Sequence, residues 1–162
     1  MKKLALLLSA LSLNCVAEDS NKEKEYSVGV GMGALYSGIG ANFSFISKND
    51  MKYISAGCTE YSSLSGYSCG FGAGWIKTDL FDFNSNKHGF GVYASLVGHE
   101  TYATLNDQYS INDNDIYGAG VSYTYFMNGI DQSGTTFGLS IHATNADFEG
   151  RYGAFFQVGY QF

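Results

Sequence analysis

Residues 152–162 read YGAFFQVGYQF, and this stretch decides the predicted fold. Counting back from the end, every second residue is apolar, while the residues between are mostly small or polar. The apolar set is Phe162, Tyr160, Val158, Phe156, Ala154 and Tyr152. A strict period of two over this length predicts a β-strand with two chemically different faces. Chain ends are normally frayed and polar, so we expect this strand to be paired within a sheet.

The same alternation recurs in seven earlier segments, least clearly in residues 51–61, with apolar side chains on one face and mainly Gly and Ser on the other. The segments are residues 26–36, 39–47, 51–61, 67–77, 88–98, 116–127 and 135–143. The chain has 21 Gly, 13 Tyr, 12 Phe and no Pro. Since proline cannot donate to a strand ladder, its absence suits a chain that is nearly all paired strand. We predict an all-β fold, an eight-stranded antiparallel up-and-down barrel over residues 26–162.

The apolar face of these strands requires a covering layer. No helical pattern or second sheet is available to provide one, so closure into a barrel with the apolar face toward lipid is the favoured solution. The alternative is a soluble barrel of the lipocalin or streptavidin type, with its apolar face inside. The second face here is Gly and Ser rather than charged, which would make a poor solvent surface. The pattern therefore favours a transmembrane barrel.

The terminal strand resembles that of bacterial outer-membrane β-barrel proteins, which end in Phe with an aromatic residue two positions earlier. Phe162, Tyr160 and Val158 match this assembly signal. The resemblance, to OmpA-like, OmpX-like and opacity-type barrels, implies recognition by the barrel assembly machinery. It also implies contact with outer-membrane lipids and lipopolysaccharide, and location in the outer membrane of a Gram-negative bacterium.

The first 17 residues have the pattern of a secretory signal peptide: Lys2 and Lys3, an apolar run, and small residues ending at Ala17. The apolar run is too short to span a bilayer. A lipid anchor on Cys15 is the alternative, although Asn14 fits lipoprotein processing poorly. Residues 18–25 form a charged periplasmic lead-in.

The charge balance excludes nucleic acid as an expected partner. The chain has 9 basic and 15 acidic residues, and residues 1–17 hold two of the lysines. The mature chain therefore carries 7 basic residues against 15 acidic ones, with no basic patch for phosphates. We expect a monomer with no cofactor and no metal site.

Cys58 and Cys69 remain after cleavage and are predicted to form a disulfide, since secreted chains favour such pairs. Two free thiols are the alternative. If residues 51–61 and 67–77 pair as a hairpin with the two cysteines opposite each other, Ile54 and Ala56 share a face with Phe71 and Ala73.

The inward face is predicted to be small residues interrupted by bulky ones, which favours a narrow or closed lumen. The candidate lumen residues are Tyr53, Tyr93, His142, Arg151 and Phe155. Residues 99–114 are the longest polar stretch and are predicted to be a loop, the main extracellular element. In a scaffold of this kind, function is expected in such loops.

His142, Thr144, Asn145 and Ala146 resemble the H-x-S-N-A stretch of outer-membrane lipid A deacylases, which implies a hydrolytic triad. Thr144 occupies the nucleophile position, and Phe156 stands where that family has Glu. We therefore expect a lumen or rim histidine, no catalytic residue, and a non-enzymatic structural or surface-interaction role. A barrel that binds or transports small apolar molecules is the alternative, and a hydrolase the remote one.

Overall fold

A computed structural model describes residues 25–62, 66–81, 85–106, 108–146 and 150–162 of the chain, without the side chains of residues 60–62, 66–67, 101–106 and 108–113. The predicted signal peptide and residues 18–24 of the lead-in lie outside the described residues. The elements are β1 Tyr26–Gly33, the 3₁₀ turn η2 Ala34–Tyr36, β2 Gly38–Ser47, β3 Asp50–Ser62, β4 Gly66–Lys77, β5 His88–Asn106, β6 Gln108–Phe126, β7 Gly134–Thr144 and β8 Tyr152–Gln161.

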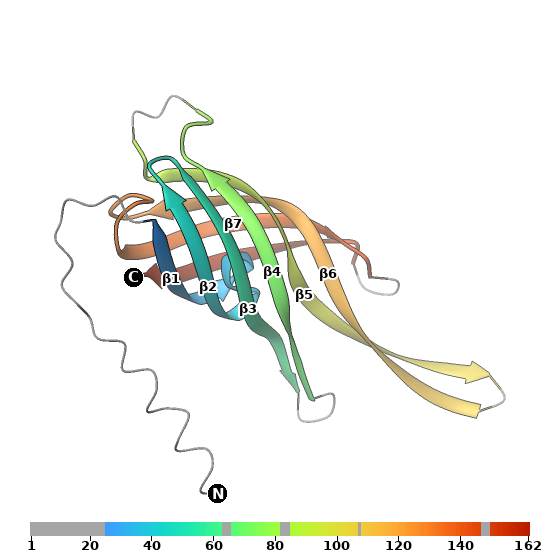
Figure 1. The fold of residues 1–162 in the computed structure, drawn as a ribbon. Helices are drawn as coiled ribbons and strands as arrows, with labels where there is room; N and C mark the ends of the chain where they lie inside the picture. Colours follow the sequence, from blue (N-terminus) through green and yellow to red (C-terminus); the bar gives the residue numbers. More distant parts are fainter. Residues whose placement is uncertain (1–24, 63–65, 82–84, 107, 147–149) are drawn as a thin grey trace, which may run out of the picture.

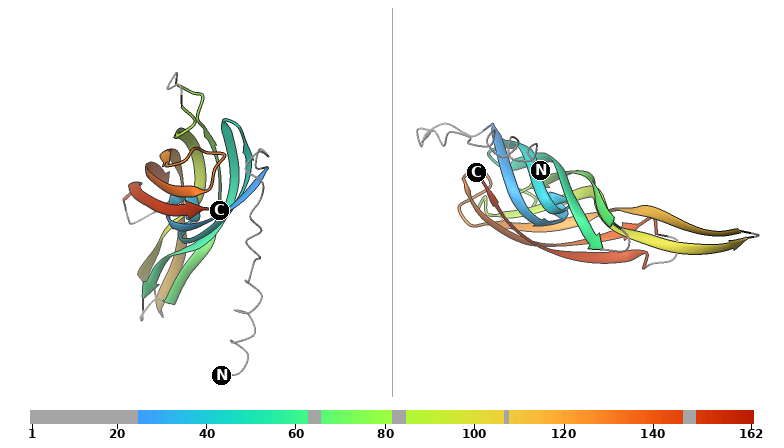
Figure 2. Two further views of the ribbon diagram at one scale, coloured as in Figure 1. Left: turned by 90° about the vertical axis from the view of Figure 1, so that its left-hand side faces the viewer. Right: turned by 90° about the horizontal axis from the view of Figure 1, so that it is seen from below.

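The strands form a closed antiparallel barrel in which each strand pairs with its sequence neighbours and β1 pairs with β8 (Figure 1). This confirms the predicted all-β, eight-stranded architecture. The start of β1, the end of β8 and the β2–β3, β4–β5 and β6–β7 connections lie at one end, here called the terminal end (Figure 2). The end of β3, β5 and β7 and the start of β4, β6 and β8 lie at the opposite, distal end, whereas the β1–β2 connection lies inside the barrel as η2. In the described part of the chain, no helix has the length and apolar character needed to cross a membrane.

The β3–β4 ladder has the register that the cysteines predict. Cys58 lies opposite Cys69, Ala56 opposite Phe71 and Ile54 opposite Ala73. A register shift follows Cys58, so that Glu60 rather than Thr59 pairs with Ser68. The predicted pairing is therefore confirmed on the terminal side of the disulfide and changes by one residue beyond it.

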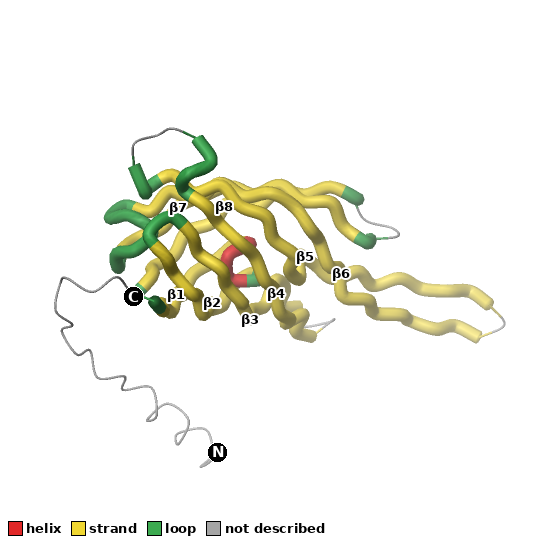
Figure 3. Tube along the Cα trace, turned by 45° about the horizontal axis from the view of Figure 1, so that its top comes forward, coloured by secondary structure: helices red, strands yellow, loops and turns green. Residues whose placement is uncertain are grey.

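The first predicted strand, residues 26–36, is too long. β1 ends at Gly33, whose φ of 106° lies in a region that only glycine adopts easily. The chain then turns into the barrel as η2, within the ring of strands (Figure 3). Tyr36, which the alternation of residues 26–36 assigns to the apolar outer face, is instead fully buried.

The prediction of a long loop at residues 99–114 is wrong. β5 and β6 continue as a paired two-stranded ribbon from Gly98↔Ile116 to Asn106↔Gln108. Their ladders to β4 and β7 end earlier, at Ser95 and Gly118, so the ribbon projects beyond the other strands (Figures 1 and 2). Polar composition was the reason for expecting a loop, but the pairing is made by backbone groups that every residue carries.

Candidate functional site

The outer wall of the barrel is an apolar belt. Side chains that alternate along every strand point outward and are exposed, among them Phe71 at 74% and Ile39 at 73%. The belt also includes Val30, Met32, Phe43, Ile54, Val92, Val121, Leu139, Ile141 and Phe156. The residues between them, such as Ser44, Ser55, Ser122 and Ser140, are buried on the inner side. The two faces are therefore arranged in the opposite sense to those of a soluble barrel, which places its apolar side chains inside.

Aromatic side chains gather on the outer wall near the terminal end. Tyr26, Phe43 and Phe45 pack on one another with ring centroids 5.4 to 6.0 Å apart. Tyr160 packs on Phe162 at 5.0 Å, and Phe90 contacts Tyr123 at 5.1 Å. Aromatic rings with a polar group favour the boundary between an apolar and an aqueous phase, so this ring of aromatics has the composition of an interfacial girdle.

The η2 turn is a plug inside the lumen. Ala34, Leu35, Tyr36 and Ser37 are at most 1% exposed. The Tyr36 hydroxyl shares a 2.9 Å hydrogen bond with Thr136 of β7, and the Ser37 hydroxyl shares one of 2.7 Å with Ser55 of β3. Asn42 donates to the Leu35 carbonyl. The plug is thus bonded to walls on two sides of the barrel.

Glycines in the wall provide the space for this plug. A Cβ on Gly159 of β8 would overlap the Tyr36 ring, and one on Gly31 of β1 would meet both that ring and β8 backbone. A Cβ on Gly57 of β3 would meet the Tyr36 carbonyl. Several of the glycines that alternate with the outward apolar residues are therefore required by what the barrel contains.

A polar network fills the rest of the terminal half. Gln157 donates to Thr124 at 2.6 Å, and Gln161 donates to Ser27 and Ser44 at 3.2 and 3.3 Å. Both glutamines are 1% exposed. An apolar cluster closes the lumen below this network, at the terminal end: Ile46, Met51, Ile76, Phe126 and Ile130. In the described part of the chain, the lumen is packed with side chains from the plug to this end.

Four of the five candidate lumen residues face the interior. Tyr53, Tyr93 and His142 are buried, and Phe155 packs on their cluster half-buried. His142 Nδ1 lies 2.8 Å from the Tyr93 hydroxyl, and its ring lies 5.1 Å from that of Phe155. Arg151 differs from expectation. It precedes β8 in the β7–β8 connection and its side chain is exposed, because β8 begins at Tyr152.

The residues that resemble a deacylase motif do not assemble as a triad in the described contacts. His142 faces the lumen and bonds to Tyr93, whereas Thr144 Oγ1 bonds within the β7–β8 connection, to the Gly150 carbonyl and the Ala146 amide. Phe156, at the position of the family's Glu, points outward. Within the described residues, no cluster of three or more His, Cys, Asp or Glu side chains could hold a metal ion.

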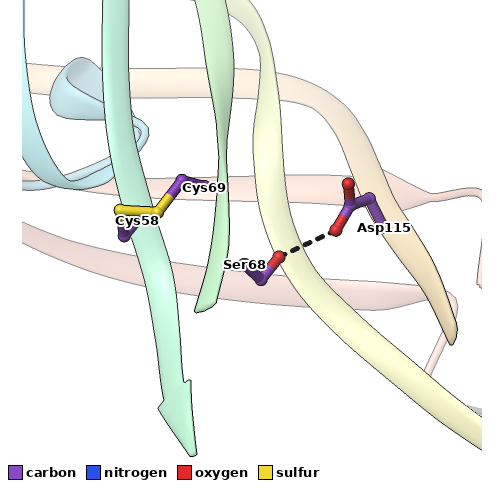
Figure 4. Close-up of a disulfide and its surroundings, with 4 residues drawn as sticks. All are labelled: Cys58, Ser68, Cys69 and Asp115. Atoms are coloured by element: carbon purple, nitrogen blue, oxygen red, sulfur yellow. Dashed lines mark hydrogen bonds between the residues drawn. A yellow bond between two sulfur atoms is a disulfide. The ribbon is translucent and has the colours of Figure 1, made fainter. Parts of the chain in front are cut away.

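Cys58 and Cys69 form the predicted disulfide, near the distal end of β3 and β4 (Figure 4). Next to it in sequence, the Ser68 hydroxyl donates to Asp115 of β6 at 2.9 Å. His99 Nδ1 lies 3.3 Å from the same carboxylate. These contacts connect the base of the ribbon to β4, where the β4–β5 ladder has already ended.

The predicted assembly-signal residues close the barrel. The Phe162 amide donates to the Val28 carbonyl at 2.9 Å, and the Ser27 hydroxyl donates to the Phe162 carbonyl at 2.9 Å. Tyr160 and Val158 pair with Val30 and Met32 of β1. The β1–β8 ladder has only four residue pairs in the described strands, so these terminal bonds are a large part of the closure.

Tyr36 is the central lumen residue that sequence reasoning missed. Tyr36 continues the alternation of apolar residues along residues 26–36, so the sequence pattern gives no sign that the strand ends before it. The signals that could have revealed it are Gly33 before it and the Ser37-Gly38 pair after it, since both favour a chain reversal.

Comparison of the chain with protein-family models, with curated proteins and with solved structures gives no match.

Proposed function

We propose that the chain is an integral outer-membrane β-barrel with a closed lumen, a non-enzymatic envelope protein whose projecting β5–β6 ribbon is its surface-interaction element. The observation that carries this proposal is the outward direction of the apolar belt. Exposing side chains such as Phe71 and Ile39 to water would be unfavourable by about 25 cal/mol per Å². Lipid removes that cost around the full circumference.

The proposed orientation of the barrel in the outer membrane follows from its two unlike ends. The aromatic girdle, the start of β1 and the end of β8 lie at the terminal end, where the proposed barrel meets the periplasm and the assembly machinery. The ribbon projects from the distal end, which corresponds to the cell surface. Outer-membrane barrels have short turns on the periplasmic side and longer extensions outside, and the β2–β3 turn and the ribbon fit this asymmetry.

The packed interior favours a closed barrel over a channel. Open pores in this class have polar, water-filled interiors, whereas here the plug, the glutamine network and the apolar cluster occupy the lumen. The same packing counts against passage of small apolar molecules through the barrel. Among the described residues, the contacts of His142 are with Tyr93 and Phe155 and include no carboxylate that would favour hydrolysis.

Two variants, each with one cysteine added to the Cys58–Cys69 disulfide, test location and orientation together. Asn114→Cys lies at the base of the ribbon and Met127→Cys beside the β6–β7 turn, and both parent side chains are exposed. A membrane-impermeant maleimide is expected to label Asn114→Cys on intact cells, and Met127→Cys only after the outer membrane is permeabilised. Equal labelling of both on intact cells, or recovery of the protein in the soluble fraction, would contradict the proposal.

A further inference from the structure

An apolar groove of about 790 Å³ lies on the outer wall. The wall side is made by outward residues of β4 to β7, and the lip is made by Leu80 and Phe81 of the β4–β5 connection. Phe81 packs edge-on against Phe90 with ring centroids 4.7 Å apart, which positions the lip over β5. The volume lies in the range of ligand sites, about 300–1,000 Å³.

The groove follows two neighbouring rows of paired residues across four strands. In one row, Trp75 pairs with Val92, Val92 with Val121, and Val121 with Ile141. In the adjacent row, the pairs join Lys77, Phe90, Tyr123 and Leu139 in the same order. Strands are about 4.8 Å apart, so three spacings give an apolar track of about 14 Å. One end of the track is charged and the other is wholly apolar.

The charged end carries both signs. Lys52 Nζ and Lys77 Nζ lie 5.6 and 5.8 Å from the centre of the Trp75 ring. The Trp75 indole donates to Asp50 at 2.6 Å, and Lys77 Nζ lies 3.4 Å from Asp79. Two ammonium groups and the Asp50 carboxylate therefore lie next to the indole at the terminal end of β3 and β4, and Asp79 pairs with Lys77, which lines the groove itself.

We infer that this groove binds one phosphatidylethanolamine molecule from the surrounding membrane, an inference that rests on the proposed function. An acyl chain lies along the track from Phe90 toward Leu139 and Ile141. The phosphate contacts Lys52 and Lys77, and the lipid ammonium donates to Asp79 or Asp50. A purely anionic headgroup satisfies the lysines but faces the carboxylates, so the mixed charge of the rim selects a headgroup with both signs.

Trp75 is the single tryptophan of the chain and lines the groove, so its fluorescence reports which lipid lies there. The protein is reconstituted in phosphatidylcholine vesicles that contain increasing fractions of phosphatidylethanolamine or phosphatidylglycerol with brominated acyl chains, which quench tryptophan on contact. We expect the relative association constant of phosphatidylethanolamine to exceed that of phosphatidylglycerol by about fivefold, the factor that one exposed ion pair contributes.

Three variants refine the result. The double substitution Lys77→Gln with Asp79→Asn is expected to remove the preference, and Phe81→Ala to weaken phosphatidylethanolamine association severalfold by removing the lip. Ile39→Ala, an exposed position of β2 outside the groove, should leave quenching unchanged. Equal quenching by both lipids, stronger quenching by phosphatidylglycerol, or no effect of Phe81→Ala would overturn the inference. Failure of the chain to insert into vesicles would instead contradict the proposed function.

Discussion

The hydroxyl groups of Tyr36 and Thr136, one hundred residues apart in sequence, share a 2.9 Å hydrogen bond inside the barrel. This bond fixes the η2 plug to β7, while Ser37 fixes it to β3. The plug is therefore part of the packed interior and closes the lumen that eight strands would otherwise enclose.

Shortening Tyr36 tests this role. Tyr36→Phe removes one buried hydrogen bond and should lower the free energy of unfolding by about 1 kcal/mol. Tyr36→Ala removes a fully buried ring and should cost about 3–5 kcal/mol. Urea unfolding of protein in lipid vesicles measures both.

The variants Tyr36→Phe and Tyr36→Ala also distinguish the packing of the plug from the closure of the lumen to ions. In planar bilayers, we expect no stable conductance from the wild type, Tyr36→Phe or Tyr36→Ala, because the apolar cluster still closes the terminal end when the Tyr36 ring is removed. A wide, stable channel in the wild type would contradict a closed lumen.

Gly159 is expected to tolerate no side chain because a Cβ there would overlap the Tyr36 ring. Gly159→Ala should lower stability by about 1–3 kcal/mol, the usual cost of overpacking. Gly98→Ala is the matched control, since its nearest neighbour atom would lie 3.7 Å from the new Cβ. Equal effects of the two substitutions in urea unfolding would mean that the plug does not set the requirement for glycine.

Val121 lies in the part of β6 that pairs with both β5 and β7, and it points outward. If it faces lipid, Val121→Arg should lower stability in vesicles by about 2–4 kcal/mol, the cost of a cation near the bilayer midplane. In a barrel surrounded by water, the same exposed substitution should change stability by less than about 0.5 kcal/mol. The measured value therefore distinguishes the two environments, and Val121→Ala controls for loss of the side chain itself.

The disulfide between Cys58 and Cys69 joins strands that already pair. Replacing both cysteines by serine should therefore leave the barrel folded but lower its stability by about 2–3 kcal/mol, because the short closed loop restricts the unfolded chain. Wild-type protein in reductant should match the serine variant. A larger loss in the variant than in reduced wild type would indicate an effect of the serines themselves.

Strand alternation was the part of the fold that could be read from the sequence. Period alone leaves the register of residues 51–61 open, and the face of Ile54 and Phe71 follows once Cys58 is placed opposite Cys69, because one fixed pair sets the faces of a whole hairpin. Tyr36 could not be placed in this way, since its pocket is made by glycines from β8 and β3 that are distant in sequence. The ribbon was missed for a different reason: its strands pair through backbone groups, which polarity does not reveal.

Phe162 is expected to matter for assembly more than for the finished barrel. Its amide and carbonyl bond to Val28 and Ser27, and its ring packs on Tyr160. Deleting Phe162 removes these bonds and, under the proposed function, the terminal aromatic of the assembly signal, so the amount of chain in the outer membrane should fall severalfold. Phe156→Ala on the same strand, also exposed on the outer face, is the matched control and should insert normally. Refolding of both variants in vesicles without assembly machinery separates recognition from stability: the deletion should still refold there, with stability lowered by the loss of its bonds to Val28 and Ser27. Normal outer-membrane insertion of the deletion would show that Phe162 is not read as a signal.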